Sequence, residues 1–134
     1  MTTPLYHAIR TKHEDAVRLL VESGADINKR YSETDCPTVW YACWNNKDMI
    51  RLLVELGLDV NSCDDRGSMF IHSVWNSNTY MMKILLANGA HIDSDWDNYT
   101  TNHSHDVIDL VRDFQSGIIS RDDLYREAYG CLPS

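Results

Sequence analysis

Three stretches of the chain repeat one another at a spacing of about 33 residues, and this repetition constrains the fold more than any other feature. Residues Val17–Asn28 (VRLLVESGADIN) recur as Ile50–Asn61 (IRLLVELGLDVN) and again as Met82–Asp93 (MKILLANGAHID). A supersecondary unit of this size cannot bury its apolar face alone, so it packs against its neighbours. We therefore expect a stack of similar units rather than a domain built around one central sheet.

Each copy has the same internal order. The segment Val17–Val21 places apolar side chains around Arg18 and predicts a helix with a buried stripe and Arg18 on the solvent face. Gly24 ends this helix, because the position after a helix favours a left-handed backbone. Asp26–Asn28 alternates polar and apolar residues and predicts a short extended arm, which the turn residues Asp64–Gly67 would reverse in the second copy.

A second helix precedes each of these segments. Pro4 and Pro37 stand where its first turn would lie, a position at which the missing N–H of proline costs nothing. Thr3–Ala8 (TPLYHA) followed by Ala16–Asn28 resembles the ankyrin repeat, whose pattern is G-x-T-P-L-H-x-A-A, a loop and V-V-K-L-L-L-x-x-G-A-D-V-N. The resemblance implies an all-α solenoid of stacked helix-turn-helix units with short β-hairpin-like loops.

The resemblance also implies the domain organisation. We expect one domain over residues 1–134, with repeats at about 3–35, 36–68 and 69–100 and capping helices at about 101–130. The capping segment predicts helices near 106–115, ended by Gly117, and near 120–129, which opens on the near capping box Ser120-x-x-Asp123. Two interpretations stay open: a degenerate fourth repeat that caps the stack, or an appendage that docks on a partner.

The copies depart from the family pattern at bulky residues. Tyr41-Ala42 and Val74-Trp75 replace the two alanines of the first helix, and we expect their bulk to widen the helix spacing. Tyr125 and Tyr129 lie one helical turn apart and are expected to cover the last core layer, unless they are exposed as a docking pair. The other expected core residues share inward helix positions: Trp40, Trp75, Met81 and Met82.

Charge and motifs exclude several function classes. The net charge is −8, and from His91 onward nine acidic residues face three basic ones, so nucleic acid and anionic membranes are poor partners and a basic protein surface is a better one. No catalytic or cofactor motif occurs, and neither the four cysteines nor His103-Ser104-His105 has metal-ligand spacing, so we expect no enzyme, cofactor or metal. Because no signal sequence or apolar span is visible, we expect the chain in the cytoplasm, or in the nucleus. We also expect it to be a monomer.

By resemblance, the chain binds a protein through the concave face formed by hairpins and first helices, as an inhibitor or adaptor, including a viral or bacterial effector acting in a host cell. Alternatively, the C-terminal helices recruit separate machinery, or the acidic end mimics nucleic acid. Asparaginyl hydroxylation is implied at Asn28 and Asn61, each eight residues after a leucine. The contact positions carried over are Arg10, Arg30, Glu33, Asp35, Trp44, Asp65, Arg66, Asn76, Asp95, Trp96, Asp97 and Asn98.

Overall fold

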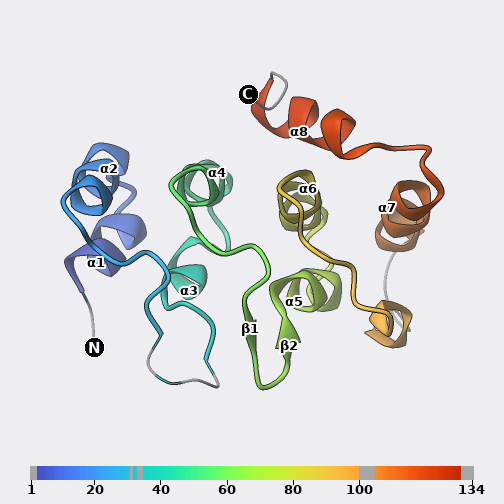
Figure 1. The fold of residues 1–134 in the computed structure, drawn as a ribbon, viewed down its shortest axis with the longest axis horizontal. Helices are drawn as coiled ribbons and strands as arrows, with labels where there is room; N and C mark the ends of the chain where they lie inside the picture. The colour runs from blue at the N-terminus through green and yellow to red at the C-terminus, as the bar shows by residue number, and fades with distance from the viewer. Residues whose placement is uncertain (1–2, 31, 33–34, 100–104, 131–134) are drawn as a thin grey trace. The chain divides into compact units, whose positions relative to one another are not determined.

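The computed structural model describes residues 3–30, 32, 35–99 and 105–130, which form two compact units, Met1–Asp65 and Arg66–Ser134. The described residues are mostly helical (Figure 1). Unit 1 contains α1 (Pro4–Arg10), α2 (Glu14–Glu22), α3 (Val39–Cys43), α4 (Lys47–Glu55) and the strand β1 (Cys63–Asp64). Unit 2 contains the strand β2 (Gly67–Ser68), α5 (Met69–Trp75), α6 (Thr79–Ala87), the 3-10 helix η1 (Trp96–Tyr99), α7 (His105–Ser116) and α8 (Arg121–Tyr129).

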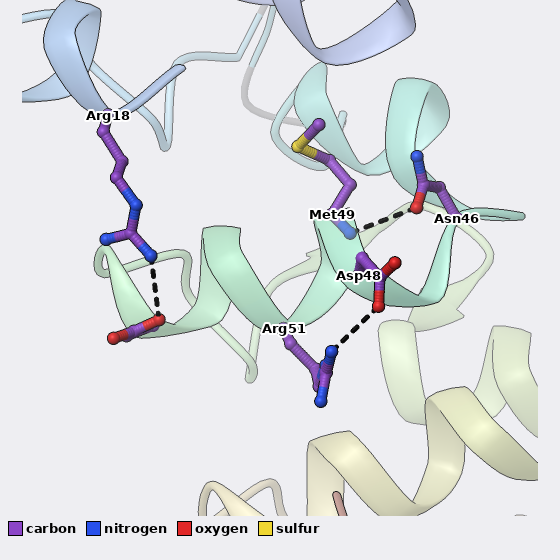
Figure 2. A network of polar contacts seen from close by, with 6 residues as sticks. Arg18, Asn46, Asp48, Met49 and Arg51 are labelled. Atoms are coloured by element: carbon purple, nitrogen blue, oxygen red, sulfur yellow. Dashed lines mark hydrogen bonds and ion pairs between the residues drawn. The ribbon is translucent and has the colours of Figure 1, made fainter. Parts of the chain in front are cut away.

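Capping side chains fix the start of several helices. Thr3 Oγ1 accepts from the backbone N–H of Tyr6 at 3.1 Å with Pro4 in the first turn of α1, as the sequence predicts. Asn46 Oδ1 accepts from the N–H of Met49 at 3.2 Å and caps α4 (Figure 2). The prediction for Pro37 is wrong in register, because α3 begins at Val39 and is only five residues long.

A glycine ends the second helix of each of the three copies. We call these helices, α2, α4 and α6, the outer helices. Gly24, Gly57 and Gly89 have φ angles of 105°, 110° and 89°, which confirms the predicted left-handed positions. The extended arm is wrong in the first copy: Asp26 Oδ1 accepts from the N–H of Asn28 at 3.0 Å, and this contact forms a turn instead. The second copy forms the same turn, because Asp59 Oδ1 accepts from the N–H of Asn61 at 2.9 Å, and the strand β1 begins only beyond it at Cys63.

Side-chain contacts join the two helix pairs of unit 1. Asn28 donates from Nδ2 to the carbonyl of Gly57 at 3.1 Å and accepts at Oδ1 from the N–H of Asp59 at 2.8 Å, so one amide holds both repeats. The indole of Trp40 is 1% exposed and donates to Ser62 Oγ at 2.7 Å, which confirms Trp40 as a core residue. Arg18 of α2 also pairs with Glu55 of α4 at 3.7 Å on the surface (Figure 2).

The apolar stripe of α2 is only partly buried. Val17 is fully buried, whereas Leu19 is 64% exposed, so the predicted burial of Leu19 is wrong. The equivalent residue of α4, Leu52, is 3% exposed. The difference arises because no described residue packs over the outer side of α2, where Glu14 and Glu22 are also exposed.

Unit 2 is organised around α6. This helix packs against α5, α7 and α8, and α8 lies across it (Figure 1). Met81 and Met82 are fully buried, as predicted, together with Leu85 and Leu86. The short helix η1 packs on α5.

The two C-terminal helices lie close to their expected bounds. Ser120 and Asp123 exchange two hydrogen bonds, from the N–H of Asp123 to Ser120 Oγ at 3.1 Å and from the N–H of Ser120 to Asp123 Oδ2 at 3.0 Å. Gly117 and Gly130 follow α7 and α8 with φ angles of 87° and 76°, which confirms Gly117 as the end of the first. Tyr125 and Tyr129 stack at 4.4 Å between ring centroids and are half-buried, in line with a covering role.

Candidate protein-interaction surface

Two large aromatic side chains are exposed on the first helices of repeats 2 and 3. Tyr41 of α3 is 60% exposed and Trp75 of α5 is 47% exposed. The predicted core position of Trp75 is wrong, because it is the last residue of α5 and its ring turns toward that of His72, at 6.0 Å between centroids. Both residues replace alanines of the family pattern and are exposed, whereas Val74, which replaces the other alanine of the third copy, is fully buried.

The contact position predicted for Trp96 is wrong. Its side chain is 8% exposed, because Trp96 opens η1 and this helix packs on α5. The N–H of Trp96 donates to the carbonyl of Asp93 at 3.1 Å, a turn that directs the indole into unit 2. An aromatic residue in this turn therefore contributes to the core and not to the surface.

The predicted contact residues of unit 1 are largely accessible. Arg10 and Arg30 are exposed, and the guanidinium of Arg10 lies 5.8 Å from the ring centroid of Tyr6. Asp35 is half-buried and accepts from Ser32 Oγ at 3.1 Å. Trp44 is half-buried at the end of α3, and Glu33 lies outside the described residues.

The contact residues predicted further along the chain are polar and accessible. Asp65 and Arg66 are exposed in the turn between β1 and β2. Asn76 is exposed and donates from Nδ2 to the carbonyl of His72 at 2.8 Å, while Asp95 and Asn98 are exposed around η1. For Asp97 the structure describes the backbone alone.

The cysteine thiols of unit 1 differ in environment. Burial raises the pKa of Cys43, which is fully buried, to about 12. Burial also raises the pKa of Cys36, whose thiol hydrogen-bonds with the hydroxyl of Tyr41, and this contact raises the pKa of Tyr41. Cys63 is exposed. The hydrogen bond to Cys36 explains how Tyr41 is held while its ring stays accessible.

The two asparagines of the predicted modification are unequal. Both amide atoms of Asn28 are engaged with Gly57 and Asp59, as described above, and the residue is half-buried. Asn61 is exposed, and its N–H donates to Asp59 Oδ1 at 2.9 Å.

The part of the chain that the structure describes holds no candidate for a metal site or for a membrane-spanning helix. Its His, Cys, Asp and Glu side chains form no group of three that could hold a metal ion; of the His103-Ser104-His105 motif only His105 falls among them. None of the described helices combines the length and apolar character needed to cross a membrane.

Comparison with known proteins identifies the repeat. The family model of the ankyrin repeat matches residues 2–32, which contain α1, α2 and the turn after them. No curated protein matches the chain significantly. The same order of helix, turn, helix and left-handed glycine recurs in α3–α4 and α5–α6. The mostly helical fold of the described residues is consistent with the ankyrin repeat matched at residues 2–32, and ankyrin repeats are in general protein–protein interaction modules.

Proposed function

We propose that this chain is a non-catalytic module that binds a protein through the first helices and the turns of its repeats. The observation that carries the proposal is the exposure of Tyr41 and Trp75, at 60% and 47%. Large aromatic side chains dominate the binding energy of protein interfaces, and here they replace the small residues of the family pattern. Burying them against a partner would stabilise a complex without any change within the helices.

Exposed polar residues on the same repeats, together with the net charge, indicate what the partner offers. In unit 2, Asp95 is exposed beside η1 and Asn76 follows Trp75, while in unit 1 Arg10 and Arg30 are exposed. With a net charge of −8, the chain favours a partner whose contact surface is basic and has an apolar anchor for an aromatic ring. We place the module among inhibitors or adaptors that act as monomers.

The proposal is tested by affinity capture from the native cell with the full chain and with a Tyr41→Ala, Trp75→Ala double variant. We expect the variant to lose the specifically captured proteins while its thermal unfolding stays cooperative. The matched control is Leu19→Ala, Ile118→Ala, which removes two side chains of similar exposure (64% and 72%) away from the first helices. Equal loss in both variants, or in neither, contradicts the proposed surface.

A further inference from the structure

The outer helix of the third repeat is built to be covered. In α2 and α4 one position carries the exposed residues Glu22 and Glu55, but its counterpart in α6 is Ala87, which is 1% exposed. A second repeat position differs in the same way: it holds the exposed Asp48 in α4 and the half-buried Tyr80 in α6. As a result α6 has no exposed residue, although it is an outer helix like the other two.

The cover on α6 is α8, which is itself a polar helix. Only Leu124 and Ala128 of its nine residues are buried, whereas Asp122, Asp123 and Arg126 are exposed. The packing of α8 on α6 is nevertheless the most extensive between any two of the described helices, so the closed arrangement is the stable one. A strongly apolar helix is thus held under a weakly apolar one.

Three polar contacts fix the position of α8 on α6. Lys83 Nζ pairs with Glu127 Oε1 at 2.8 Å, and Arg121 Nε donates to the carbonyl of Ala87 at 2.9 Å. Asn88 donates from Nδ2 to the hydroxyl of Tyr129 at 3.2 Å. The carbonyl of Ala87 lies in the last turn of α6, where unpaired carbonyl groups attract a cation such as the guanidinium.

Gly89 shapes the same place. It has a φ of 89°, and a Cβ atom built there would lie 3.5 Å from the guanidinium carbon of Arg121. The guanidinium therefore lies against the backbone just beyond α6. Arg121 and Glu127 of α8 thus contact the C-terminal end of α6 and Lys83, which lies one turn before that end. Any helix that carries matching groups can make the same contacts.

We propose that the surface of α6 beneath α8 is a helix-binding site that the chain's own α8 closes. Its occupant from another protein is an amphipathic helix with an arginine, a leucine and a glutamate at the spacing of Arg121, Leu124 and Glu127. The basic group of Lys83 and the carbonyl of Ala87 select the charges at the two ends of this helix. The inference does not depend on the surface around Tyr41 and Trp75.

The seating of α8 predicts how such a partner would compete. A segment tethered by a short linker acts at an effective concentration in the millimolar range, so a helix in trans binds the closed chain weakly. Loosening α8 must therefore strengthen binding in trans. Simple damage to the fold would not, and this difference separates the proposal from a purely structural role of α8.

The probe is a fluorescein-labelled peptide with the sequence of residues 118–130, titrated into full-length chains and followed by fluorescence anisotropy. We expect the Leu124→Ala chain to bind it at least tenfold more tightly than the wild-type chain. The matched control is Leu110→Ala, which truncates a leucine of α7 with 6% exposure and changes no residue of α8. Equal affinity of all three chains would overturn the proposal.

Charge reversal provides the second readout. Adding Lys83→Glu to the Leu124→Ala chain should lower its affinity for the wild-type peptide. A peptide that carries Glu127→Lys should bind this doubly substituted chain more tightly than the wild-type peptide does. Binding that is indifferent to both reversals would overturn the proposed site even if the peptide binds. Self-association of the wild-type chain in light scattering, with a cross-link between position 83 of one copy and position 127 of another, would make a second copy the occupant and would overturn the assignment to a different protein.

Discussion

The helices α4 and α6 occupy equivalent places in successive repeats, yet they solve burial differently. In α4, Lys47, Asp48 and Glu55 are exposed and five apolar residues are buried, as expected of an amphipathic outer helix. In α6 every residue is buried or half-buried, and Lys83 is its only charge. The comparison teaches that a repeat pattern fixes the backbone, while the neighbours of each copy decide which side chains it can carry.

The largest effect on stability is expected when α4 and α6 exchange their residues at the repeat position of Glu55 and Ala87. Ala87→Glu places a carboxylate where the exposed fraction is 1%, and we expect it to lower the free energy of unfolding by about 3 kcal/mol or more. Glu55→Ala, the reverse exchange in α4, should change it by no more than about 0.5 kcal/mol. Urea unfolding followed by circular dichroism measures both, and equal effects would end the comparison.

The second prediction concerns the cover itself. Leu124→Ala removes a side chain that is 1% exposed between α8 and the rest of unit 2, with an expected loss of about 2 to 4 kcal/mol. Amide hydrogen exchange in α6 should accelerate together with that in α8. The control Leu19→Ala, at a side chain that is 64% exposed, should cost no more than about 0.5 kcal/mol. Unchanged exchange in α6 would argue that α8 does not protect it.

A smaller effect compares ion pairs at the same repeat position. Lys83 of α6 pairs across to Glu127 of α8, whereas Arg51 of α4 pairs at 2.8 Å with Asp48 on its own helix. Double-mutant cycles with alanine should give a coupling free energy of about 0.5 to 1 kcal/mol for the first pair and about 0.3 kcal/mol for the second. A larger coupling within α4 than between α6 and α8 would contradict the assigned role of Lys83.

The smallest expected effect is a pH dependence of α8. Hydrogen bonds from the N–H and hydroxyl of Ser120 lower the pKa of Asp123. A carboxyl whose pKa is lowered in the folded state contributes stability above its ordinary pKa, and this contribution disappears as the pH falls through the lowered value. Hydrogen exchange at the start of α8 should therefore accelerate in acid. Asp123→Asn should reduce this dependence, whereas Asp122→Asn, at a neighbouring exposed residue, should retain it.

Much of the architecture could be predicted from the sequence because its signals are local. Gly24, Gly57 and Gly89 require a left-handed backbone, and the capping box of Ser120 and Asp123 depends on residues only three apart. Such features need no knowledge of the neighbours, and the structure confirms them. They also locate the start of α8, but not the helix on which it packs.

The errors concern side chains whose burial depends on neighbours. Leu19 is exposed because no described residue covers the outer side of α2, and Trp96 is buried because η1 folds back onto α5. Trp75 faces outward because α5 ends there. The periodicity of the sequence does not predict these three outcomes. It identifies the position of a side chain on its helix or turn, but not whether another element covers that position.

One signal for the covered helix was present in the sequence. The position that holds Glu22 and Glu55 in the first two copies holds Ala87 in the third. The loss of an outward charge at a repeated position indicates a helix that does not face solvent. The sequence does not show which element covers this helix. The structure shows that it is α8, whose Arg121 donates to the carbonyl of Ala87.

The central claim, that α8 closes over α6 while the outer side of α4 stays accessible, is tested most directly by thiol labelling. Full chains carrying Ala87→Cys or Glu55→Cys, each with Cys63→Ser and Cys131→Ser, are reacted with a thiol reagent under native conditions. We expect labelling at position 87 to be at least a hundredfold slower than at position 55. Equal labelling rates in two folded chains would show that the third outer helix is as open as the second.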